Sequence, residues 1–143
     1  MTVRVAHISE IPEPEYEADP GAGEWRPVRA HFGIASFGAN AYVARAGGDQ
    51  IVGDHTETDD SGTSHEELYF VASGGATFTV DGEEVDAPAG TFLYVRDPDS
   101  RRAAIAHEPG TTVLCLGGEP GAAFSVSPWE QKYFGPDPPV ARA

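Results

Sequence analysis

The sequence has little cysteine, little lysine and no long apolar run. Its 143 residues include one cysteine, Cys115, which cannot form a disulfide within the chain. The surrounding TTVLCLGG is apolar, so we interpret this thiol as a small buried residue. No run approaches the roughly 18 apolar residues of a membrane-spanning helix. The segment MTVRVAHISE lacks the apolar centre of a signal peptide, so we expect a cytoplasmic protein.

Positive charge is also scarce. Lys and Arg number nine against 23 Asp and Glu, which gives a formal net charge of −14. A surface of this sign repels the phosphates of nucleic acids and of anionic membranes. We therefore expect neither a nucleic acid nor a membrane partner, and we interpret the acidity as a solubilising surface.

Glycine and proline are abundant, at 17 and 12 residues, and they divide the chain into short apolar segments. This pattern predicts eight to ten short strands and an all-β fold, and Asp81-Gly82 predicts a tight hairpin. Residues 54–64 are polar and acidic without a period, which predicts a loop. The expected strands lie within 28–36, 39–47, 47–55, 67–74, 76–80, 83–90, 91–98, 101–110 and 111–118.

The two ends of the chain differ from this central part. Residues 9–27 carry four prolines and six acids, which predicts an extended arm anchored by Trp25. Ser127, Pro128 and Glu130 form a capping-box pattern that predicts a helix over 128–134. We therefore expect an N-terminal arm over 1–27, a barrel over 28–127, and a short helix with a tail over 128–143.

Two spacings in the middle of the chain are informative together. Glu67 is followed, after six residues, by Gly74. Gly82 is followed after five residues by Pro88-Ala89-Gly90, after two more by Leu93, and after three more by Asp97. In this order, over about residues 40–118, the spacings resemble the two motifs of the cupin family. The resemblance implies a jelly-roll β-barrel.

The chain departs from the metal-binding members of that family. In those members two histidines precede the glutamate and one stands in the second motif. The corresponding residues here are Ser61, Thr63 and Leu93, so that only Glu67 remains of the four ligands that the resemblance implies.

Other histidines provide an alternative ligand set. His65 and Glu67 are two residues apart, so on one strand they share a face, and a loop could bring His55 beside them. Two histidines and a carboxylate form the facial triad of non-haem Fe(II) sites, and Zn or Mn also accepts these ligands. The competing interpretation is a hydrogen-bonded polar pair at the start of a strand, with no metal.

Other polar residues are candidates to line a barrel interior. Asn40 and Tyr42 share one face of their segment, Tyr69 shares the face of Glu67, and the resemblance places Leu93 at the site. Because barrel mouths commonly hold ligands, we predict that these four residues bind a small molecule. The alternative is that the tyrosines are core aromatic residues.

Three functions follow from these patterns. The first is binding of a small molecule in the barrel without a tightly held metal. The second is a metal-dependent enzyme, a dioxygenase or isomerase, that uses His55, His65 and Glu67. The third is acid–base catalysis without metal, as in epimerases that resemble cupins, with His65 as the base. The resemblance also implies a homodimer.

Overall fold

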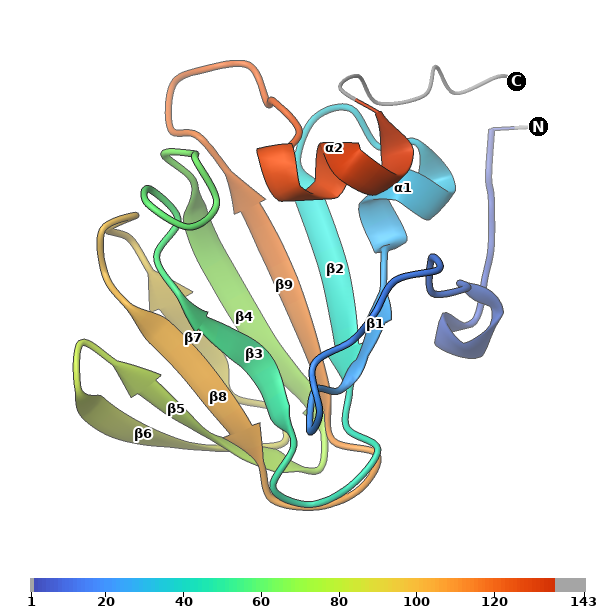
Figure 1. Ribbon diagram of the computed structural model, residues 1–143. Helices are drawn as coiled ribbons and strands as arrows, with labels where there is room; N and C mark the ends of the chain where they lie inside the picture. Colours follow the sequence, from blue (N-terminus) through green and yellow to red (C-terminus); the bar gives the residue numbers. More distant parts are fainter. Residues whose placement is uncertain (1, 136–143) are drawn as a thin grey trace.

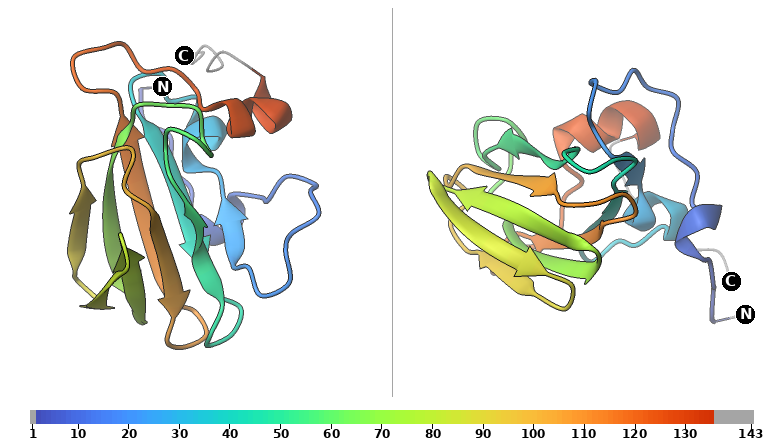
Figure 2. Two further views of the ribbon diagram at one scale, coloured as in Figure 1. Left: turned by 60° about the vertical axis from the view of Figure 1, so that its left-hand side comes forward. Right: turned by 90° about the horizontal axis from the view of Figure 1, so that it is seen from below.

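The computed structural model describes residues 2–135 and shows two facing antiparallel sheets (Figures 1 and 2). One sheet has the strand order β1-β2-β9-β4-β7, and its strands are β1 (Glu24–Arg26), β2 (Gly38–Val43), β9 (Thr112–Gly118), β4 (Glu66–Ser73) and β7 (Phe92–Val95). The other has the order β3-β8-β5-β6, and its strands are β3 (Gln50–His55), β8 (Arg102–Ala106), β5 (Gly75–Val80) and β6 (Glu83–Pro88).

This topology is a jelly roll. From β2 to β9 the chain crosses to the other sheet after every strand except in the β5–β6 hairpin, and strands such as β2 and β9 pair although they are far apart in sequence. The hairpin predicted at Asp81-Gly82 is confirmed: both residues have positive φ, 49° and 83°, and they join β5 to β6. Such φ values give the turn a twist that matches the flanking strands. The all-β jelly roll expected from the sequence is therefore confirmed.

The core lies between the sheets. Along β4 and β9 every second side chain points inward, and Tyr69, Val71, Val113 and Cys115 are buried there. The Tyr69 ring meets Phe78 of β5 edge to face, with centroids 5.4 Å apart. Burial of a side chain such as Phe78 contributes roughly 1.5–3 kcal/mol, so these contacts between the sheets stabilise the fold.

The N-terminal arm and the C-terminal helix α2 (Pro128–Phe134) meet at an aromatic cluster. Trp25 is buried there, and its ring lies 5.0 Å from Trp129, 5.3 Å from Tyr133 and 5.7 Å from Tyr16, measured between centroids. The arm begins with a short 3-10 helix, Ile8–Glu10. The predicted anchor role of Trp25 and the predicted helix over 128–134 are both confirmed.

The strand predicted over residues 28–36 is wrong. Residues Val28–Phe32 form helix α1, which ends at Gly33 with a φ of 69°. Its buried Arg29 forms an ion pair with Glu130 of α2 through Nε and Oε2. This contact between distant segments outweighs the strand preference of Val and Phe.

The same ion pair changes the start of α2. Glu130 turns to Arg29, and Ser127 makes no side-chain capping bond, so the predicted capping box does not form. Pro128 at the first helical position still starts the helix, because its fixed φ suits the first turn. Within residues 2–135, no helix has the length and apolar character required to span a bilayer.

Gly74, the last residue of the first motif, provides a test of the fold. Its φ is 71°, and a Cβ there would lie 2.3 Å from Thr111 Oγ1 and 2.8 Å from Thr111 Cα. We expect Gly74→Ala to lower the free energy of unfolding by roughly 2–4 kcal/mol, combining backbone strain with overpacking. Urea unfolding measures the change.

Gly121→Ala is the matched control for this substitution. Gly121 has nearly the same φ, 70°, but nothing lies within 4 Å of the added Cβ. At that position only the backbone strain of an alanine with positive φ remains, which costs about 1 kcal/mol. Equal losses in the two variants would contradict the assigned contact with Thr111.

Candidate functional site

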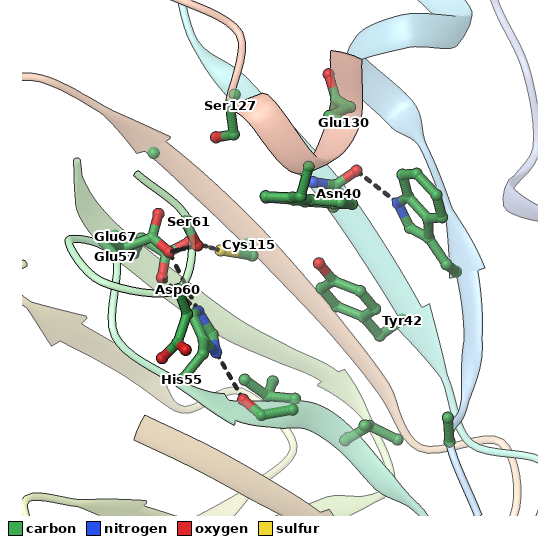
Figure 3. Close-up of a pocket in the computed structure, with 18 of the residues that line it drawn as sticks. Asn40, Tyr42, His55, Glu57, Asp60, Ser61, Glu67, Cys115, Ser127 and Glu130 are labelled. Carbon is green, nitrogen blue, oxygen red and sulfur yellow. Dashed lines mark hydrogen bonds and ion pairs between the residues drawn. The ribbon is translucent and has the colours of Figure 1, made fainter. Parts of the chain in front are cut away.

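A cavity of about 460 Å³ opens between the sheets at the end of the sandwich near α2 (Figure 3). One wall comes from β2, β4 and β9, another from β3 and the loop after it, and a third from the arm and α2. Both tryptophans of the chain, Trp25 and Trp129, line it. Its volume is within the range of small-molecule sites.

Three of the four predicted ligand-binding residues line this cavity: Asn40, Tyr42 and Tyr69. Asn40 accepts a hydrogen bond from Trp25 Nε1 at 2.8 Å. Leu93 does not line the cavity. It lies opposite Tyr69 on β7 and packs against the core, so its position does not support the prediction for Leu93.

The acidic loop carries a residue that the sequence analysis missed. The carboxylate of Glu57 lies 3.2 Å from His55 Nε2, and that nitrogen lies 3.8 Å from Glu67 Oε1. One ligand atom from each of these three residues lies within 4.8 Å of the others. The converging set is therefore His55, Glu57 and Glu67, in place of the expected His55, His65 and Glu67.

Glu57 is held by its own loop and by the connection after β7. Its amide donates to the Pro98 carbonyl at 2.9 Å, and its Oε2 accepts from Ser61 Oγ at 2.7 Å. Ser61 is the residue that stands where the metal-binding cupins have a histidine. A signal for Glu57 was present in the sequence, because His55-Thr56-Glu57 repeats the His-x-Glu spacing of His65 to Glu67.

Arg102, also missed, places a positive charge beside these carboxylates. It lies at the start of β8 and is fully buried, with a relative exposure of 0%. Its Nη1 donates to Glu67 Oε1 at 3.2 Å and lies 3.9 Å from Glu57, while Nη2 donates to the Asp97 carbonyl. Nothing in the sequence distinguishes this arginine from the exposed Arg101.

Glu67 receives further hydrogen bonds from its own sheet. The Tyr69 hydroxyl donates to Oε1 at 2.6 Å, and the Cys115 thiol donates to Oε2 at 3.0 Å. Burial alone would raise the pKa of Glu67, but its contacts with His55, Tyr69 and Cys115 together lower it below the ordinary value. Burial and the nearby Glu67 raise the pKa of Cys115, so this thiol is not activated as a nucleophile.

A metal ion fits this donor set poorly. The distances are not the obstacle, because the ligand atoms of a tetrahedral zinc site with bonds of ~2.0–2.2 Å lie about 3.4 Å apart, and His55 Nε2 lies 3.2 Å from Glu57 and 3.8 Å from Glu67. The groups already bound to Glu67 are. Both oxygens of Glu67 already accept hydrogen bonds, and the guanidinium of Arg102 would repel a divalent cation.

His65 lies apart from this set. It is buried, with a relative exposure of 5%, and its ring stacks on Phe124. Its closest carboxylate is Glu57, 3.9 Å from Nδ1, rather than the predicted Glu67. Neither ring nitrogen has a hydrogen-bond partner within the described part of the chain, and the residue lines the cavity.

His55 gives the site a pH-dependent contribution to stability. Burial alone would lower its pKa, but Glu57, Glu67 and the Gly53 carbonyl raise it from 6.5 to about 10. When folding raises the pKa of a group, protonation of that group stabilises the folded state. This stabilisation is complete below the pKa of the unfolded chain and is lost as the pH rises through the pKa of the folded state. The stability lost in His55→Gln should therefore be greatest below pH ~6.5 and fall toward zero near pH ~10.

Urea unfolding of both proteins between pH 6 and 10 measures this difference. His107→Gln is the matched control, because His107 lies outside the cavity beside Thr77. A stability difference for His55→Gln that stays constant over this range would contradict protonated His55 as the partner of the two glutamates.

Solved structures are similar to this chain, although no protein-family model and no curated protein sequence matches it. A putative sugar phosphate isomerase from Acidithiobacillus ferrooxidans has 17% identity and a TM-score of 0.58, over 79% of this chain and 73% of that one. A cupin protein from Bacteroides fragilis has 20% identity and a TM-score of 0.53, over 77% and 86%. A Photorhabdus luminescens protein has 14% identity and a TM-score of 0.59, over 82% and 87%.

At these identities the likeness concerns the fold. It agrees with the strand order and with the two motif spacings around Glu67 and Pro88. The chain therefore has the fold of the cupin superfamily.

Proposed function

We propose that the protein binds a small organic molecule in the cavity between its sheets without requiring a metal ion. The observation that carries this proposal is the cavity itself, which combines an aromatic wall with polar groups that have no partner. The Tyr42 hydroxyl and the Asn40 amide nitrogen make no hydrogen bond within residues 2–135. Both residues are half-buried at the cavity wall, so a ligand that hydrogen-bonds to these groups gains about 0.5–1.5 kcal/mol for each bond.

The charge arrangement supports metal-independent binding. Arg102 and protonated His55 together balance the charges of Glu57 and Glu67, which is the task that a divalent cation would perform in a metal-binding relative. Ser61 supports Glu57 by a hydrogen bond, and Leu93 belongs to the core. Two of the three departures from the metal-binding motif, Ser61 and Leu93, thus have a structural role that needs no metal.

A metal-dependent reaction is the second candidate, favoured by the convergence of His55, Glu57 and Glu67. It requires Arg102 to leave Glu67, since the guanidinium and a divalent cation would compete for the same carboxylate. The two candidates therefore differ in what Arg102 does.

Removal of Arg102 tests this difference. Arg102→Met should lower the free energy of unfolding by about 3–5 kcal/mol, because it leaves a buried carboxylate without its cation. Zn²⁺ should then raise the melting temperature of the variant and not that of the parent, since ion binding to the folded state stabilises it. Arg101→Met removes the same charge at an exposed position and should show neither effect.

Metal independence would be contradicted if the purified parent protein contained near-stoichiometric Zn²⁺, Mn²⁺ or Fe²⁺, and if EDTA removed this metal and lowered the melting temperature. Elemental analysis of protein made without a histidine tag measures this directly.

The two tryptophans report on ligand binding. Because Trp25 and Trp129 both line the cavity, a molecule that enters it should change the intrinsic fluorescence. We expect at least one class in a panel of neutral sugars, alcohols, amines, carboxylates and phosphates to do so saturably and to raise the melting temperature.

Tyr42→Phe should weaken that binding by roughly fivefold to tenfold, the value of one hydrogen bond, and leave protein stability nearly unchanged. Tyr94→Phe removes a hydroxyl from an exposed residue of β7 and should not weaken binding. Failure of every class to alter fluorescence and melting temperature would contradict the proposed function.

A further inference from the structure

The wall of the cavity is acidic. Among the described residues that line it there is no lysine or arginine, while six carboxylates do so: Asp19, Asp54, Glu57, Asp60, Glu67 and Glu130. A phosphate or carboxylate ligand needs cationic side chains or N–H donors directed at it. This wall offers such a ligand mainly acceptors of its own sign.

The arginines that compensate these acids do not line the cavity. Arg102 and Arg29 are buried, with relative exposures of 0% and 1%, and they pair with Glu67 and Glu130. Arg101 pairs with Asp54 at 3.1 Å from the exposed side. A ligand in the cavity therefore meets the carboxylate side chains without these arginines, and His55 is the one cationic partner among the described lining residues.

His55 does not serve as a donor for an anion either. Its Nδ1 is 2.6 Å from the Gly53 carbonyl and its Nε2 is 3.2 Å from Glu57. Both ring nitrogens are thus directed at protein acceptors, which leaves neither for a ligand.

One oxygen of Glu57, Oε1, and the ring of His65 form the part of the wall that lacks hydrogen-bond partners in the described chain, whereas Oε2 of Glu57 is bonded to Ser61. Glu57 is buried, and the nearest polar group recorded for its Oε1 is His65 Nδ1 at 3.9 Å, beyond hydrogen-bond length. His65 is 95% buried, and its ring nitrogens have no bond within the described chain. A carboxylate oxygen on a cavity wall without a protein donor is bound best by a charged N–H donor of a ligand.

Aromatic rings face the same space. Trp25 and Trp129 lie 5.0 Å apart at the wall near α2, and Figure 3 shows the Tyr42 hydroxyl pointing across the cavity toward Glu57 and Glu67. The faces of such rings attract organic cations as well as apolar groups.

We infer that the ligand is an organic cation with a primary ammonium group directed at Glu57 and a hydrophobic part against Trp25 and Trp129. This inference rests on the proposed function, whose cavity it uses. The same features disfavour phosphorylated ligands, in contrast to what the name of the Acidithiobacillus structure implies for that protein.

Three probes of one shape and different charge test the inference: cyclohexylmethylammonium, cyclohexylmethanol and cyclohexanecarboxylate. Tryptophan fluorescence titrations give their affinities for the whole protein, with inorganic phosphate as a fourth probe. The ammonium should bind at least about tenfold more tightly than the alcohol, which matches a cation–π contact and a charged hydrogen bond, and the carboxylate most weakly.

Glu57→Gln should reduce the preference for ammonium over alcohol to less than about threefold, since it removes the charge and keeps the shape. Glu84→Gln is the matched control: Glu84 is exposed on β6, lies outside the cavity and carries the same charge. The melting temperature of each variant shows whether it is folded, and the three-probe comparison on the parent protein stands without the variants.

Alcohol or carboxylate binding that equals or exceeds ammonium binding would overturn the inference and leave the proposed function intact. Tight binding of phosphate would overturn it in the same way. No response to any probe at tens of millimolar, combined with a negative panel of other compounds, would contradict the proposed function as well.

Discussion

A buried guanidinium that joins the two sheets organises the site. Arg102 belongs to β8 of one sheet, and Glu67, its partner, belongs to β4 of the other. Burial of either charge alone would cost several kcal/mol, so each needs the other together with further hydrogen bonds. Tyr69, Cys115 and the Asp97 carbonyl provide these bonds, and the pair thereby fixes how the sheets meet at the cavity.

The residues around this pair form a consistent set. Glu57 is within 3.9 Å of Arg102, is bonded to Ser61, and holds His55 in its charged form. These interactions connect three elements: strand β4, strand β8 and the loop that follows β3. A substitution at one of these charged residues therefore alters the charge balance of the others. The result is a site whose polar end is assembled from protein charges, beside an aromatic wall from the arm and α2.

The fold was predictable because its signals are local. Alternation along β4, the Asp81-Gly82 turn and Pro128 at the first position of α2 each specify their element without help from distant residues. The error at residues 28–36 has the opposite cause. Helix α1 depends on Arg29 reaching Glu130, 101 residues away, and no local pattern reveals such a pair.

The site was predictable only in part, for the same reason. Spacing along one strand predicted that Tyr69 and Glu67 share a face, and both line the cavity. The loop after His55 was expected to bring that residue near His65, and His55 lies beside Glu67 and Glu57. Glu57 lies in the same loop and was missed. Arg102 was missed because it lies on β8, which shares no sequence motif with β4. The Tyr69 hydroxyl also donates a hydrogen bond to Glu67 although the two residues are two apart on one strand, because the tyrosine side chain is long enough to reach along the strand.

The most direct test of the central claim is a crystal structure of protein purified without chelator, with anomalous diffraction recorded at the Fe, Mn and Zn edges. The account predicts the Arg102 guanidinium against Glu67 and no anomalous peak among His55, Glu57 and Glu67. A metal bound by these three side chains, with Arg102 turned away from Glu67, would contradict it.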